Sequence, residues 1–124
     1  MIIDMKKYII FIIACLFSVQ AFAQVSFDKY FEEKTLRIDY VQSGNSQTQT
    51  AVIYELREEP VWGGPKKNLI DNLGRGGYYF KVYDKKSGEL IYSKGYCTLF
   101  EEWLTTEEAK RETQAWLNSI VMPY

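Results

Sequence analysis

The 124-residue chain contains no histidine. Histidine is the commonest general base and a frequent zinc ligand, and it completes the Ser-His and Cys-His nucleophile systems. The two cysteines, Cys15 and Cys97, are too few for a site built from thiolates alone. We therefore expect no catalytic residue, no metal ligand and no cofactor in this chain, and do not expect it to be an enzyme.

Carboxylates are plentiful, and two of them could in principle catalyse glycoside hydrolysis, but a domain of about a hundred residues offers little room for a deep cleft. Adjacent residues on a strand point to opposite faces, so we interpret paired glutamates as solvated surface. No Asp-x-Asp-x-Asp-Gly calcium loop occurs, and Gly74-Arg75-Gly76-Gly77 precedes an expected strand, whereas a phosphate-binding loop precedes a helix. The net charge of −1 is nearly balanced, which argues against a nucleic-acid partner. The glutamate pairs are Glu32-Glu33, Glu58-Glu59, Glu101-Glu102 and Glu107-Glu108.

The first 23 residues have the pattern of a secretory signal. Lys6 and Lys7 precede the apolar run Tyr8–Val19, and Ala21 and Ala23 frame a small-x-small cleavage site. The apolar run is shorter than the ~20 residues that span a bilayer, so we expect no stable membrane span after cleavage. The sequence predicts a signal peptide over residues 1–23 and a mature domain over 24–124, exported to the periplasm, cell surface or extracellular space.

Each cysteine allows two interpretations. Cys15 follows Ile-Ile-Ala, as in a lipoprotein signal, but the apolar run continues beyond it, so we place it inside the cleaved signal and keep lipidation as the alternative. Cys97 is then the single cysteine of the mature chain and has no disulfide partner. No histidine exists to activate its thiol, so we expect burial as a small apolar residue in preference to a reactive thiol.

The stretch Gly77–Cys97 predicts a β-hairpin. Aromatic and β-branched residues mark one strand before Asp84 and another after Glu89, and Gly88 suits a left-handed position in the turn. If Asp84 faces Glu89, Val82 lies opposite Ile91. This register places Tyr79, Lys81, Tyr83, Leu90, Tyr92 and Lys94 on one face.

The remaining pattern predicts an all-β domain. Alternation over Thr35–Val41 indicates a half-buried strand, and Gln49–Leu56 and Thr113–Val121 are further strands. Thr105 followed by acidic residues indicates a short helix near the C-terminus, whereas Thr98–Leu104 fits a bent strand or one helical turn. With five to seven short strands and no βαβ rhythm, we predict an immunoglobulin-like antiparallel β-sandwich with one short helix near the C-terminus.

The loop Pro60–Pro65 presents Trp62 between helix and strand breakers. Trp62 either folds back as a lid on the sandwich edge or forms an exposed stacking platform. In the second case it joins Tyr79, Tyr83 and Tyr92 as a possible binding surface for a glycan or a protein.

The order of these motifs resembles the N-terminal domain of the M64 metallopeptidases, the group called IgA peptidases. The resemblance covers nearly all of the mature chain, and Met122-Pro123-Tyr124 is similar to the point where that domain gives way to the rest of the protein. In the family a zinc-dependent catalytic domain follows, with ligands in an H-E-x-x-H helix that this chain lacks. The matching segments are Phe27–Phe31, Lys34–Tyr40, Pro60-x-Trp62-x-Gly64, Tyr83–Tyr92 and Leu99–Ala109.

The resemblance implies a non-catalytic accessory β-sandwich domain that packs on or orients a catalytic domain absent from this chain. The partner would then be an M64-type catalytic domain, covalently attached in the family. The alternative is a free-standing module that binds a glycan or another protein through its exposed aromatic side chains. Neither zinc nor peptidase activity transfers to any residue of this sequence.

Overall fold

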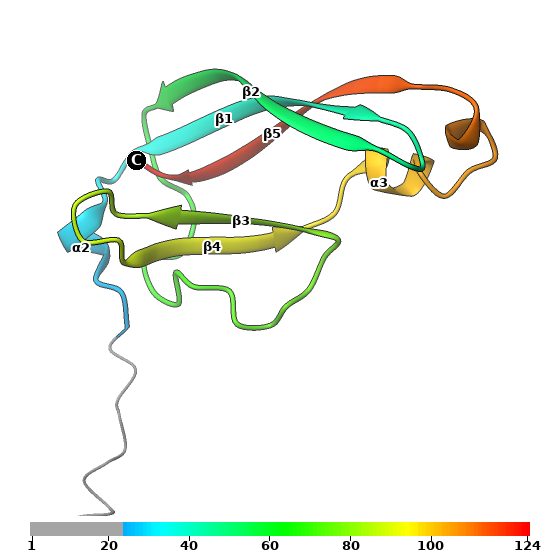
Figure 1. The fold of residues 1–124 in the computed structure, drawn as a ribbon. Helices are drawn as coiled ribbons and strands as arrows, with labels where there is room; N and C mark the ends of the chain where they lie inside the picture. The colour runs from blue at the N-terminus through cyan, green and yellow to red at the C-terminus, as the bar shows by residue number, and fades with distance from the viewer. Residues whose placement is uncertain (1–23) are drawn as a thin grey trace, which may run out of the picture.

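The structure is a computed structural model that describes residues 24–124. The expected signal, with Ala21, Ala23 and Cys15, lies outside the described residues. Figure 1 shows the arrangement and carries the labels used below. The elements are α2 (Phe27–Tyr30), β1 (Thr35–Gly44), β2 (Gln49–Glu59), β3 (Tyr78–Tyr83), β4 (Leu90–Tyr96), α3 (Leu99–Trp103), the 3₁₀ turn η1 (Glu108–Lys110) and β5 (Gln114–Pro123).

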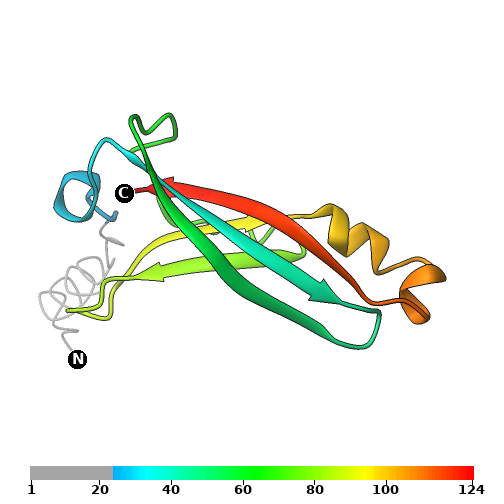
Figure 2. The same ribbon diagram turned by 90° about the horizontal axis from the view of Figure 1, so that it is seen from above.

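The strands form two antiparallel sheets. One has the order β2-β1-β5, and the other is the β3-β4 hairpin. Figures 1 and 2 show the hairpin lying against one face of the three-stranded sheet, with α2 near the C-terminus and α3 at the opposite end. This confirms the predicted all-β, sandwich-like fold, whereas its assignment to the immunoglobulin type stays a prediction. None of the helices within residues 24–124 has the length and apolar character needed to cross a membrane.

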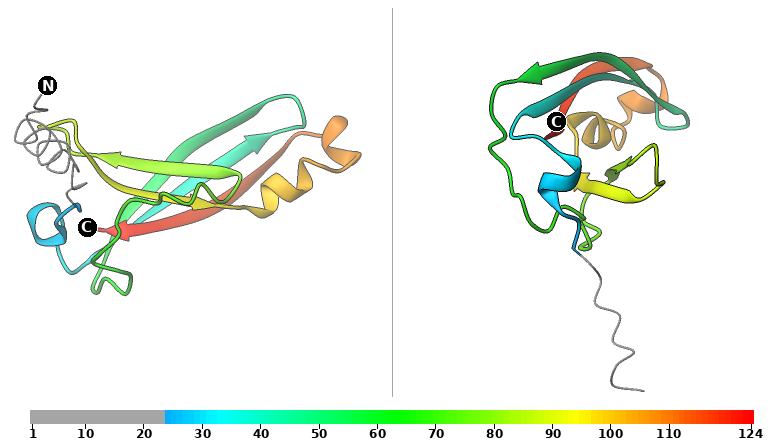
Figure 3. Two further views of the ribbon diagram at one scale, coloured as in Figure 1. Left: turned by 90° about the horizontal axis from the view of Figure 1, so that it is seen from below. Right: turned by 90° about the vertical axis from the view of Figure 1, so that its left-hand side faces the viewer.

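The helical turns match the sequence prediction in part, because Thr98–Leu104 was expected as a bent strand or one helical turn, whereas the short helix was expected to begin at Thr105. Thr98–Leu104 contains the α-helix α3, because Thr98 Oγ1 accepts a hydrogen bond from the Glu101 backbone N–H at its start. The segment expected to start a helix at Thr105 makes only the 3₁₀ turn η1. Figure 3 shows both turns at the same end of the molecule. There Phe100, Trp103 and Ala109 form a small buried cluster against Trp116 of β5.

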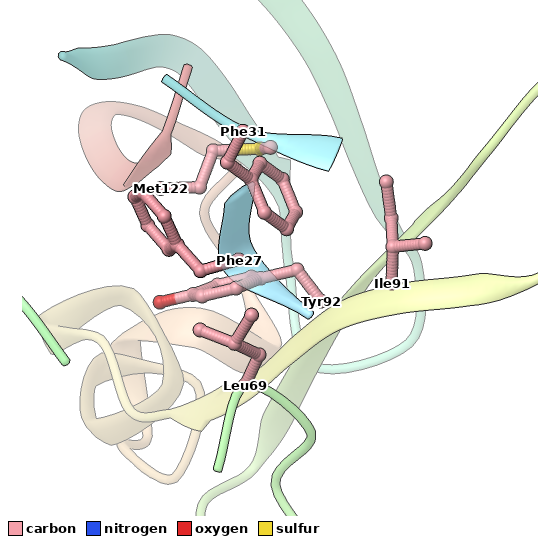
Figure 4. Packing of buried hydrophobic residues seen from close by; sticks show 6 residues of the cluster. All are labelled: Phe27, Phe31, Leu69, Ile91, Tyr92 and Met122. Atoms are coloured by element: carbon pink, nitrogen blue, oxygen red, sulfur yellow. The ribbon is translucent and has the colours of Figure 1, made fainter. Parts of the chain in front are cut away.

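The main core joins segments from across the chain. Figure 4 shows its six buried side chains meeting between the hairpin and the end of the other sheet. Tyr92 is central, since its ring lies 6.2 Å from Phe31, 5.6 Å from Phe80 and 6.4 Å from Trp62 between ring centroids. These aromatic contacts therefore fix the hairpin on the sheet. The cluster contains Phe27, Phe31, Leu69, Ile91, Tyr92 and Met122.

The predicted hairpin register is right at the turn and wrong beyond it. The Asp84 N–H donates to the Glu89 carbonyl over 2.9 Å, and Gly88 has a φ of +73°, as expected for a left-handed glycine. The register then shifts between Val82 and Tyr83, so Val82 faces Tyr92 and not Ile91. This bulge turns Tyr92 away from Tyr79 and Tyr83 and into the core.

The outer face of the three-stranded sheet holds a buried carboxylate. Asp39 of β1 is 4 % exposed and accepts a hydrogen bond of 2.8 Å from Arg37 Nε. Ser119 of β5 donates a second hydrogen bond to the same carboxylate oxygen. These hydrogen bonds, that from Ser119 first, lower the pKa of Asp39, because they stabilise its ionised form.

We expect Asp39 to make the domain less stable in acid. The pKa of Asp39 is lower in the folded than in the unfolded state, so its ionised form stabilises the fold. This stabilisation is present above the unfolded-state pKa of about 3.9 and is lost as the pH falls through the lower folded-state pKa. The free energy of unfolding, measured with urea from pH 7 to about pH 2, should therefore fall more steeply with falling pH in the wild type than in Asp39→Asn. Equal pH dependence of the two proteins would contradict this assignment.

Candidate functional site

The four aromatic residues predicted as a binding surface do not lie together. Tyr79 and Tyr83 are 37 % and 55 % exposed on the outward face of β3. Tyr92 is 5 % exposed in the core, so it cannot belong to an exposed surface. The physical reason is the bulge in the hairpin, which places Tyr92 on the same face as Phe80 and Val82.

Trp62 lies against the core and not clear of it. Its ring is half-buried and meets Tyr92 edge to face, with an interplanar angle of 81°. The indole Nε1–H donates to the Pro65 carbonyl over 3.0 Å, and the Trp62 backbone N–H donates to Glu33 over 3.2 Å. The ring therefore covers the edge of the sandwich, which matches the lid interpretation of this residue.

Strand β2 carries a run of exposed apolar side chains. It pairs with β1 on one side, and in the order β2-β1-β5 no strand covers its other edge. All of its residues except the half-buried Glu59 are exposed. Val52, Ile53, Tyr54 and Leu56 are exposed by 59 to 70 %. Such a strand offers both apolar side chains and unpaired backbone groups to a partner.

A cleft lies between β2 and the hairpin, and we call it the edge cleft. It has a volume of about 270 Å³ and a mainly apolar lining. Ile53 and Val52 of β2 form one wall, and Phe80 and Val82 of β3 form another. The main core between the two sheets contains side chains of β1 and β5 but none of β2, so this cleft stays open beside β2. Ile38, Tyr40, Ala51, Lys81, Tyr96 and Ile120 complete the lining.

A second hollow, which we call the terminal cleft, lies at the end of the chain. Its volume is about 460 Å³, and it is lined by Leu36, Leu56, Glu58 and Tyr124. Tyr124 is held there because its N–H donates to the Lys34 carbonyl and its carbonyl accepts from the Glu32 N–H, at 2.9 and 2.8 Å. A polypeptide continuing from Tyr124 would thus emerge beside the apolar side chain of Leu56.

The polar groups near the edge cleft suit binding better than acid–base chemistry. The Tyr40 hydroxyl donates to the Tyr96 hydroxyl over 3.0 Å. Burial, followed by this hydrogen bond, raises the pKa of Tyr40 well above its usual value, so the phenol stays neutral at physiological pH. Within residues 24–124, no group of histidine, cysteine, aspartate or glutamate side chains is placed to hold a metal ion. The arrangement can therefore bind apolar groups.

Cys97 is exposed, so the expectation of burial is wrong. It lies in the short link between the end of β4 and Thr98, which caps α3. The link carries the chain from the sheet to the helix and leaves this side chain outside both clusters.

Sequence reasoning missed the exposed surface of β2. The segment Gln49–Leu56 was expected as a strand, but the exposure of its apolar side chains was not predicted. The available signal was that Val52, Ile53 and Tyr54 are consecutive, so apolar side chains fall on both faces of the strand. A strand of this kind is either central in a sheet or lies at an interface.

The fold and its surfaces define a class of protein: a small two-layer β domain with an exposed, apolar edge strand, β2. The comparison with protein families is more specific. Residues 26–124 match the family model described as Peptidase M64 N-terminus, and the chain belongs to this family. This confirms the resemblance inferred from the motif order. Among curated proteins, no relative matches the sequence.

We expect Trp62 to contribute to stability and Tyr83 to contribute little. Trp62→Ala removes a ring that packs on Tyr92, which should lower the free energy of unfolding by about 2 kcal/mol. Tyr83→Ala removes an exposed side chain and should change it by less than about 0.5 kcal/mol. Chemical denaturation monitored by circular dichroism measures both, and a neutral Trp62→Ala would contradict the lid interpretation.

Proposed function

We propose that this chain is an exported, non-catalytic accessory domain that packs on and orients an M64-type catalytic domain. The observation that carries the proposal is the family match over residues 26–124, because the family is defined as the N-terminal part of a peptidase. The absence of histidine from the whole sequence supports a non-catalytic role, since zinc peptidases of the H-E-x-x-H kind bind their metal through histidine.

The surface of β2 supports the same proposal. A catalytic domain that follows Tyr124 would begin at the terminal cleft, next to Leu56. From there the exposed apolar side chains of β2 lead to the edge cleft at Ile53. Packing a second domain against this strand would remove those side chains from water. Each Å² of apolar area buried in this way stabilises the contact by about 25 cal/mol.

Export would follow from the N-terminal leader. The leader has the three parts of a secretory signal in the expected order. A positive region with Lys6 and Lys7 comes first, the apolar run follows, and the Ala21-Phe22-Ala23 cleavage site comes last. The proposed mature chain would begin at Gln24.

The alternative, a glycan-binding module, has less support. Of its four proposed aromatic residues, Tyr79 and Tyr83 are exposed, whereas Tyr92 is buried and Trp62 packs on the core. Two tyrosines four residues apart on one strand are separated by about 13 Å, which is wide for a single sugar ring.

The proposal is tested by adding the purified chain to an M64 catalytic domain prepared without its own N-terminal domain. Isothermal titration calorimetry should show binding, and Ile53→Lys should weaken it at least about tenfold, since a charge would enter an apolar interface. Tyr83→Lys is the matched control, because Tyr83 is similarly exposed but lies on the outward face of β3. Peptidase activity of the chain alone, or equal binding by the two variants, would contradict the proposal.

A further inference from the structure

The free edge of β2 carries a charge pattern that is complementary to itself. Glu55 and Arg57 lie two residues apart on the same face of the strand, with 2.7 Å between Arg57 Nη2 and Glu55 Oε2. Leu56 lies between them and points to the opposite face, where it lines the terminal cleft. We propose that β2 pairs in antiparallel fashion with the β2 of a second copy of this chain, centred on Leu56.

The strand is suited to such pairing. Edge strands in soluble proteins are normally protected by charged side chains (above all lysine), by proline, by a β-bulge or by a covering element. Within Gln49–Glu59 there is neither lysine nor proline, the bulge lies at Tyr54 outside the segment proposed to pair, and Glu55 and Arg57 complement the same charges on a second copy. In the described sheet β2 has β1 as its single neighbour. A partner strand would satisfy the backbone groups that point away from β1.

Symmetry limits the possible registers. Two copies of one strand pair antiparallel about a two-fold axis perpendicular to the sheet, which keeps equivalent faces on the same side. Facing residues must then belong to the same face of the sheet. The axis therefore passes midway between one residue and the same residue of the other copy. With the axis at Leu56, the two leucines face each other on the inner side.

On the outer side, this register places Glu55 of each copy opposite Arg57 of the other. The two existing pairs become a ring of four alternating charges. An axis at Glu55 or at Arg57 would instead set two like charges face to face, which is unfavourable. The following acids do not disturb the ring, because Glu58 pairs with Lys34 at 2.8 Å and Glu59 lies 3.7 Å from Arg37 within their own chain.

The extent of pairing sets the strength of the dimer. The β1–β2 register shifts between Asp39 and Tyr40, which leaves Tyr54 as the extra residue of a bulge, and Pro60 follows the strand at its other end. Regular pairing is therefore confined to a short segment around Leu56. An interface of this size is small, so we expect a dissociation constant in the micromolar range.

This dimer uses the surface assigned above to a catalytic domain, and in that respect it rests on the proposed function. Both occupants cover Leu56 and cannot bind together. The dimer is thus the form of the domain when no catalytic domain covers β2, and it keeps the apolar edge from water in that state.

The test uses protein purified after expression of the full-length sequence, with its N-terminus identified by mass spectrometry. Sedimentation velocity between about 1 and 300 µM should show a monomer that converts to a dimer. Arg57→Glu places two glutamates opposite each other on both sides of the axis and should weaken dimerisation at least about tenfold. Glu55→Arg should do the same through opposed arginines.

The decisive step is to mix the two variants. A heterodimer of Arg57→Glu with Glu55→Arg restores opposite charges at both positions across the axis, so the mixture should dimerise at concentrations at which each variant alone is monomeric. A folding defect in either variant cannot produce this recovery. The double variant Glu55→Arg/Arg57→Glu should also dimerise as the wild type does.

Three results would overturn the inference: a wild-type monomer throughout the concentration range, a dimer unchanged by Arg57→Glu, or no recovery in the mixture. The assay contains a single protein and no peptidase. Its failure therefore leaves the calorimetric test of the proposed function untouched, and a failure to bind the catalytic domain leaves the dimer result standing.

Discussion

The packing of Tyr92 is the contact on which the rest of the structure depends. Its ring meets Phe31, Trp62 and Phe80, which come from the N-terminal segment, the loop after β2 and the opposite strand of the hairpin. The single cysteine of the described residues can form no internal disulfide, so this aromatic packing must hold the hairpin against the sheet. The bulge beside Tyr83 makes the packing possible, because it turns Tyr92 toward the core.

The position of the hairpin also explains the exposed edge. A two-stranded layer cannot cover a three-stranded sheet, and the core contacts place it over β1 and β5. The strand left over is β2, which keeps Ile53 and Leu56 beside open clefts. In our account this uncovered strand is where the domain meets other proteins, either a catalytic domain or a second copy of itself.

Much of the fold could be predicted from local sequence. Alternation identified β1, the turn chemistry of Asp84 and Gly88 identified the hairpin, and breakers identified the loop around Trp62. The burial of Tyr92 could not be predicted, because a bulge depends on contacts with Phe31 and Trp62 that are distant in sequence. The exposure of β2 escaped prediction for a related reason: consecutive apolar residues indicate burial on both faces, but they do not say which molecule provides it.

Residue-resolved amide hydrogen exchange on dilute protein tests the central claim, that β2 is an uncovered edge, most directly. We predict that successive amides of β2 alternate between slow and fast exchange, since every second N–H points away from β1, whereas β1 is protected by strands on both sides. Uniformly slow exchange along β2 at a concentration where the protein is monomeric would contradict the account, because it would show that another part of the chain covers this edge.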